Sequence, residues 1–167
     1  MTPLMKDRLA LLDEIPLLSG GHTAPSPRCD KPEGCLEEIY SWVYDLPWSD
    51  RNEETVSPVI AAFLRSLNDR LGDEERQLLK PYIVKQHGTA GDGYDEERGV
   101  LCANWLVGTA LPIWLDLAGA PETAADLRSR TYTPDTIDEL RHLLREIRED
   151  MWERSADWRA QISEAAK

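Results

Sequence analysis

The run GVLCANWLVGTALPIWLDLA, residues 99–118, decides the fold of this chain. From Gly99 to Leu115 it holds seventeen residues without a charge, and apolar side chains occur at nearly every angle around a helix. A helix that is apolar all round is typical of the centre of a domain. We therefore predict that residues 99–118 form a buried central helix on which the other helices pack.

Seventeen uncharged residues also approach the length of a membrane span. Asn104, Gly108, Thr109 and Pro112 interrupt the run, and acidic residues crowd its entrance. We therefore interpret it as the core of a soluble protein and expect no membrane association. Pro112 lacks a backbone donor and its ring presses on the carbonyl of Gly108, so we expect a kink there.

Helix signals dominate on both sides of this run. Thr2-Pro3, Ser57-Pro58 and Thr133-Pro134 each place a capping residue before a proline, as helix starts do. Apolar spacings of 3, 4 and 7 predict helices, and no run alternates as a strand would. The remaining helices are expected at 4–15, 35–46, 58–71, 121–129 and 134–162, with a frayed tail after residue 162. A short helix is expected from Asp73 to a break at Pro81, with a further turn or two to Gln86. The prediction is an all-α, single-domain bundle of about six to seven helices over residues 1–167.

Composition narrows the function classes. The chain has 167 residues, a formal net charge of -12 and a pI near 4.7. A charge of this sign argues against direct binding to nucleic-acid phosphates or to an anionic membrane. Three cysteines do not make a disulfide framework, and the N-terminus lacks the apolar core of a signal peptide. We expect a cytoplasmic protein with reduced thiols.

A second stretch concentrates chemical groups: SGGHTAPSPRCDKPEGCLEE, residues 19–38. Residues 17–34 form a long loop, and such loops are usually functional or disordered. Its candidate residues are His22, Cys29, Asp30, Cys35 and Glu38. Zinc favours thiolate, imidazole and carboxylate ligands, so His22, Cys35 and Glu38 form a possible site for a zinc-type divalent metal.

Other interpretations of this loop remain open. Cys35 lies near a helix N-terminus, which would lower its pKa and favour a nucleophilic thiol. Cys29 and Cys35 could form a redox pair, although they lack CxxC spacing. Alternatively, Cys35 is a small buried residue and His22 only hydrogen-bonds the loop. We expect specific polar contacts to hold the loop in each case.

Three further groups are candidate binding residues. Trp48 and Asp50 lie between two predicted helices, where a tryptophan can anchor a partner or cover the core. Arg65 and Asp69 are spaced as a surface ion pair, or as the polar floor of a pocket if they face the long loop. Trp152 and Trp158 lie on the last helix, whose apolar seam could bind a partner or a second copy.

Four segments together resemble a family of uncharacterised bacterial proteins: CLEEIYSWVYDLPWSD, SPVIAAFLRSLNDRL, LLKPYI and ANWLVGTALPIWLDLAG. The resemblance covers residues 18–128 and rests on a Gly-His loop, a Cys-x-x-Glu helix start, a Pro-Trp-Ser-Asp turn and a Pro-Val-Ile-Ala-Ala-Phe helix. It implies no established activity. Members carry additional His and Cys after the Ser-Asp, where this chain has residues 51–55, RNEET. If the family binds metal there, this chain would have lost those ligands.

Three functions follow as hypotheses. The first is a small acidic helical interaction or regulatory protein, because no P-loop, GxSxG, HExxH or GxGxxG motif occurs. It would bind a protein partner or itself through the C-terminal helix. The second is a metal-binding or thiol-dependent enzyme with its site at residues 19–38. The third is an acidic decoy that mimics nucleic acid, which only the charge supports.

Overall fold

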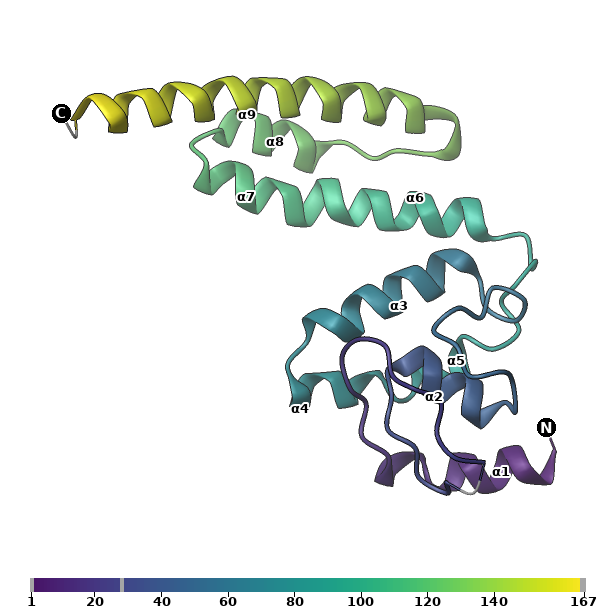
Figure 1. Cartoon of the computed structure of the whole chain (residues 1–167). Coiled ribbons are helices and arrows are strands. Elements are labelled where there is room, and N and C mark those ends of the chain that lie inside the picture. Colours follow the sequence, from purple (N-terminus) through teal and green to yellow (C-terminus); the bar gives the residue numbers. More distant parts are fainter. Residues whose placement is uncertain (1, 28, 166–167) are drawn as a thin grey trace. The chain divides into compact units, whose positions relative to one another are not determined.

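The computed structural model describes residues 2–27 and 29–165, and the side chains of 2–27 and 29–156. It is 65% helical and has no strand among the described residues, so the all-α prediction is confirmed. The one pairing of extended backbone is an isolated parallel bridge between Leu17 and Gly34. Figure 1 shows the order of the helices along the chain.

The contacts of the chain group it into two compact units, residues 1–98 and 99–167. The first unit holds the long loop and the second holds the whole of the uncharged run. The expected single domain therefore stays a prediction.

The first unit is built from short helices. They are α1 (Pro3–Ala10), η1 (Leu12–Glu14), α2 (Leu36–Val43), α3 (Pro58–Arg70), α4 (Asp73–Arg76), η2 (Gln77–Leu79) and α5 (Tyr82–Lys85). The Thr2 side chain accepts a hydrogen bond from Met5 N–H, and Ser57 caps α3 in the same way at Ile60. Both cap-then-proline predictions are therefore correct helix starts.

Helix α2 is the centre of this unit. All eight of its residues are buried, including Glu37, Glu38 and Ser41. Helices α1, α3 and α5 contact it, and its apolar side chains join one core with Ile15, Leu17 and others. A helix this short is marginal alone, so its stability comes from this packing.

Helix α2 is shorter than predicted. It ends at Val43 rather than near Leu46, because Asp45 adopts a left-handed conformation with φ of 58°. Aspartate tolerates this region better than most residues. The Arg8 guanidinium holds the turn by donating to the carbonyl of Trp42 and to Asp45 Oδ1 (3.0 Å).

The long helix of residues 95–117 begins in the last four residues of the first unit, and its greater part, residues 99–117, belongs to the second unit together with a return segment and the last helix. The long helix comprises α6 (Asp95–Trp105), a π turn named η3 (Leu106–Ala110) and α7 (Leu111–Leu117). In the π turn, Leu111 N–H donates to the carbonyl of Leu106, five residues back. The segment where we expected a kink thus contains a π turn, which ends two residues before Pro112. Such a turn accommodates a proline, because proline has no backbone N–H to donate.

Helices α8 (Pro121–Ser129), η4 (Pro134–Thr136) and α9 (Ile137–Ala165) complete the unit. The apolar seam of α9 is buried inside it: Leu140 and Ile147 pack with Val107, Leu115 and Leu127 in two small cores. Asn104 also exchanges two hydrogen bonds of 2.8 Å with the backbone of Tyr132. The seam that we expected to bind a partner is therefore occupied within the unit.

The burial expected for the uncharged helix is wrong. Only Val107, Pro112 and Leu115 are buried in η3 and α7, and α6 has no buried residue. By length and composition the 95–117 helix could cross a membrane, and only 17% of its apolar window is buried, whereas the core helix of a soluble protein is mostly buried. The second unit is too small to cover the helix, since α8 and α9 lie on one side of it (Figure 1).

Candidate functional site

The N-terminal end of the long loop is fixed by polar contacts. Gln77 donates to the carbonyl of Leu17 and accepts from its N–H, at 3.0 and 2.9 Å. Asn68 donates to the carbonyl of Leu18 (2.9 Å), and Asp69 accepts from Gly20 N–H (2.9 Å). The left-handed φ of 81° at Gly20 directs its N–H there. The loop therefore has the specific contacts that we expected.

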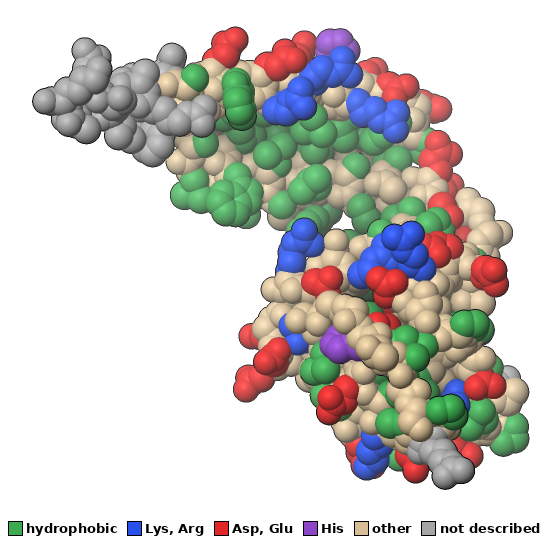
Figure 2. All heavy atoms as spheres, viewed as in Figure 1, with side chains coloured by type: hydrophobic (Ala, Val, Ile, Leu, Met, Phe, Trp, Pro, Cys, Tyr) green, Lys and Arg blue, Asp and Glu red, His purple; other side chains and the backbone are tan. Residues whose placement is uncertain are grey.

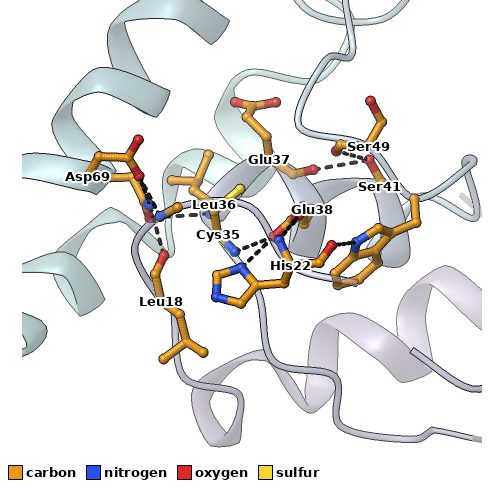
Figure 3. A network of polar contacts seen from close by, with 12 residues as sticks. Leu18, His22, Cys35, Leu36, Glu37, Glu38, Ser41, Ser49 and Asp69 are labelled. Atoms are coloured by element: carbon orange, nitrogen blue, oxygen red, sulfur yellow. Dashed lines mark hydrogen bonds and ion pairs between the residues drawn. The ribbon is translucent and has the colours of Figure 1, made fainter. Parts of the chain in front are cut away.

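The Glu38 carboxylate joins the loop to the start of α2. Its Oε1 accepts from His22 N–H at 2.6 Å, and its Oε2 accepts from Cys35 N–H at 2.8 Å. Oε2 also lies 2.9 Å from His22 Nδ1. Figure 3 shows the carboxylate between the loop at His22 and the N-terminus of α2 at Cys35. The structure thus brings together the three residues proposed from the sequence.

The Cys35 thiol completes this helix cap. Cys35 is the N-cap residue, and its sulfur accepts from the backbone N–H of Glu38 while Glu38 returns the bond to Cys35 N–H. This reciprocal arrangement is a capping box with sulfur in the place of a hydroxyl. Two orphan donors of the first turn are satisfied in this way.

Trp48 closes the cluster. Its Nε1 donates to the carbonyl of His22 at 2.9 Å. Its ring packs so closely on Gly34 that a Cβ atom at that position would lie about 3.0 Å from the ring carbons. A side chain at Gly34 would also meet Glu38 Oε2 at 3.0 Å. Of the two roles expected for Trp48, the structure shows the covering one.

The thiol is protonated at neutral pH. Burial raises the pKa of Cys35 to about 12, and the negative charge of Glu38 adds to the rise, although backbone N–H groups oppose it. The expected lowering by the helix N-terminus is therefore wrong in sign. The reason is that Cys35 is only 3% exposed, so the cost of burying a thiolate exceeds the stabilisation by the helix.

The donor set does not assemble as a metal centre. Among the residues with described side chains, no group of three or more His, Cys, Asp or Glu is placed to hold a metal ion. Both oxygens of Glu38 already accept hydrogen bonds. Cys29 has a free thiol and bonds through its N–H to the carbonyl of Ser26, while Asp30 is exposed; neither contributes to the cluster.

The other predicted residues have separate roles. Arg65 donates to the carbonyl of Asp50 at 2.9 Å, and Asp69 binds Gly20, so both face loops rather than each other. Trp152 is 68% exposed and lines a shallow hollow of about 420 Å³ with Arg148, Glu149 and Glu153. Trp158 lies outside the described side chains.

Sequence reasoning missed a second polar network on α2. Asn52 donates to Glu37 Oε2 (3.0 Å), and the Ser41 hydroxyl donates to Asn52 Oδ1 (2.9 Å). Burial raises the pKa of Glu37, which is fully buried, although Asn52, Gln86 and the charge of Arg65 oppose the rise. The only signal in the sequence was Glu37 itself, which directly follows the apolar Leu36 on the helix.

The network extends to a histidine. The Tyr40 hydroxyl lies 2.8 Å from Thr55 Oγ1 and 2.8 Å from His87 Nδ1, and the His87 ring stacks on Tyr44 with centroids 3.8 Å apart. Asn52 and Thr55 also line a cavity of about 280 Å³ in the 46–55 segment. These contacts tie the 46–55 segment and His87 to α2.

Comparisons with family models, with curated proteins and with solved structures give no match.

Proposed function

We propose that the chain is a small acidic interaction protein, with the loop and α2 as its structural anchor and the uncharged helix as its binding element. The single observation that carries this proposal is the exposure of apolar side chains along α6, η3 and α7. Leu101, Trp114 and Leu117 are 70%, 69% and 75% exposed. Large exposed apolar patches mark interaction sites.

The chemistry at the loop supports the same proposal by weakening the enzyme alternative. A cysteine nucleophile reacts as a thiolate, and burial raises the pKa of the Cys35 thiol to about 12. Both oxygens of the Glu38 carboxylate accept hydrogen bonds, one from the loop and one from the helix cap. Through these hydrogen bonds, His22, Cys35 and Glu38 hold the loop against the start of α2.

A photoreactive amino acid at position 101 tests the proposal in intact cells. We expect covalent products that mass spectrometry assigns to peptides of a protein partner, either another protein or a second copy. Position 78 is a matched control, because Leu78 is 73% exposed but lies on the first unit. Products with lipid, or no product at position 101 beyond that at position 78, would refute an interaction role for this helix.

Elemental analysis of the purified protein provides the complementary test. We expect no stoichiometric zinc and no change on treatment with a chelator. One bound zinc per chain, lost in His22→Ala and Cys35→Ser together, would establish the metal-binding alternative instead.

A further inference from the structure

The exposed apolar residues of the long helix form one stripe. Leu101, Trp105, Thr109, Ile113 and Leu117 follow one another at intervals of four residues, and all five are exposed. In an α-helix a four-residue spacing drifts around the axis, since one turn holds 3.6 residues. The wider π turn at Leu106–Ala110 falls in the middle of the stripe and corrects this drift. The stripe therefore stays on one face.

The opposite face is already used. Val107, Pro112 and Leu115 are buried, and Val107 and Leu115 belong to the two cores formed with α8 and α9. The stripe is thus a second apolar face that the second unit does not cover. Figure 2 shows hydrophobic side chains gathered along α7.

The stripe is large enough for a stable interface. With the flanking Leu106 and Trp114, at 50% and 69% exposure, it presents on the order of 750 Å² of apolar side-chain surface. A typical patch on a monomer is about 300–600 Å², and a standard interface buries about 800 Å² per partner. One partner of similar size would cover the stripe.

The order of residues in the stripe favours a second copy as that partner. It reads Leu, Trp, Thr, Ile, Leu, with large apolar residues placed evenly on each side of Thr109. In a two-fold interface the same patch must complement itself. An antiparallel pair centred on Thr109 places Leu101 against Leu117 and Trp105 against Ile113. The small Thr109 meets its own copy at the axis and lets the helices approach.

Charge is consistent with this pairing. No charged residue occurs between Gly99 and Leu115, and the one charge within the 101–117 segment, on Asp116, is paired with Arg128. A lipid occupant is disfavoured, because the covering helices carry ion pairs such as Arg128–Asp116 and Arg130–Asp126 next to the same helix. Those charges would enter the hydrocarbon with a spanning helix, at high cost.

We propose, resting on the proposed function, that the chain forms an antiparallel two-fold dimer through the 101–117 stripe, with Thr109 at the axis. Sedimentation of the full chain from about 1 to 100 µM should show the mass rising from 18.9 kDa toward twice that value. Leu101→Glu should remain monomeric over that range, and Leu78→Glu should behave as wild type. Circular dichroism of both variants checks that they fold.

Cysteine cross-linking tests the register. In a background with Cys29→Ser and Cys102→Ala, Thr109→Cys should form a disulfide-linked dimer under mild oxidation, whereas Leu78→Cys should not. A mixture of Leu101→Cys and Leu117→Cys chains should cross-link at least tenfold faster than either variant alone. Preferential linkage of Leu101→Cys to itself would refute the antiparallel register.

The outcomes also separate this inference from the proposed function. A chain that stays monomeric at 100 µM, yet photocross-links from position 101 to a different protein in cells, refutes the dimer and retains the interaction role. A monomer that floats with phosphatidylcholine vesicles through Leu101 and Trp105 refutes both.

Discussion

Two helices of this chain reverse the usual relation between sequence and burial. Helix α2 carries two glutamates and a serine among eight residues, and every one of its residues is buried. The 95–117 helix holds seventeen consecutive uncharged residues, yet much of its surface is exposed. Burial therefore depends on how much chain is available to cover a helix, and not only on its hydrophobicity.

The difference in burial between the two helices follows from how much of the chain packs around each of them. A loop from Leu17 to Gly34, the 46–55 segment and three neighbouring helices surround α2, and their N–H groups satisfy its carboxylates. In the second unit, α8 and α9 supply cores to one face of the long helix. The polar residues of α2 thus bond to the chain around it, whereas the second unit leaves the apolar residues on the other face of the long helix uncovered.

The largest effect that would test this contrast is expected at Glu38. Glu38→Ala removes the acceptor for His22 N–H and Cys35 N–H and leaves a void, so it should lower the free energy of unfolding by about 3 kcal/mol. Urea denaturation measures the change. Glu38→Gln keeps one acceptor oxygen and should lose less.

Glu33→Ala, at an exposed position of the same loop, is the control and should change stability by less than about 0.5 kcal/mol. A loss at Glu38 no larger than at Glu33 would show that the cluster does not hold the loop to α2.

A smaller effect, dependent on pH, is expected at Glu37. Burial raises its pKa in the folded protein, so the folded state binds the proton more tightly than the unfolded state does. The contribution to stability is then present at low pH and is lost as the pH rises from the ordinary value of 4.5 through the folded pKa.

Glu37→Gln keeps an acceptor for Asn52 and removes this titration. The variant should therefore gain stability relative to wild type as the pH rises from 4 to 8, in denaturation series at constant ionic strength. Parallel curves for the two proteins would show that Glu37 titrates normally.

The sequence predicted the all-α fold, the helix starts at Pro3 and Pro58, and the meeting of His22, Cys35 and Glu38. The helix starts and the Cys35–Glu38 pairing depend on local signals, because a cap, a proline or a Cys-x-x-Glu spacing acts within one turn of a helix. The contact of His22 with Glu38 joins residues 16 positions apart and was proposed from the chemistry of the side chains alone. The long-range features were not predictable in the same way. The direction of the Cys35 pKa depends on burial by distant segments, and the Tyr40–His87 contact joins residues 47 positions apart.

The exposure of the uncharged helix was missed for a related reason. An apolar stretch indicates that a helix packs against other apolar residues. It does not indicate whether those residues belong to the same chain. Leu115 and Leu117 are alike in the sequence, but only Leu115 finds a core within the second unit.

The last of these effects, on reactivity rather than on stability at neutral pH, is expected at Cys35. Because its pKa is about 12, the thiol should resist iodoacetamide at pH 7.5 in the folded protein, and the rate should rise only with unfolding. The partly exposed Cys29 is the internal control and should react faster, as peptide mass spectrometry can measure. Stability should also fall between about pH 9 and 12, where the unfolded chain ionises this thiol more easily. Rapid alkylation of Cys35 that slows in His22→Ala would instead indicate an activated thiol.

The most direct test of the contrast compares the same substitution in the two helices, as a function of protein concentration. Leu36 on α2 is fully buried, whereas Leu101 is 70% exposed. Leu36→Ala should lower the free energy of unfolding by about 2–5 kcal/mol at every concentration. Leu101→Ala should cost less than about 1 kcal/mol in dilute protein, with a loss that grows as dimers form. A loss of 2–5 kcal/mol at Leu101 that is independent of concentration would contradict the account, because the stripe would then be buried within a single chain.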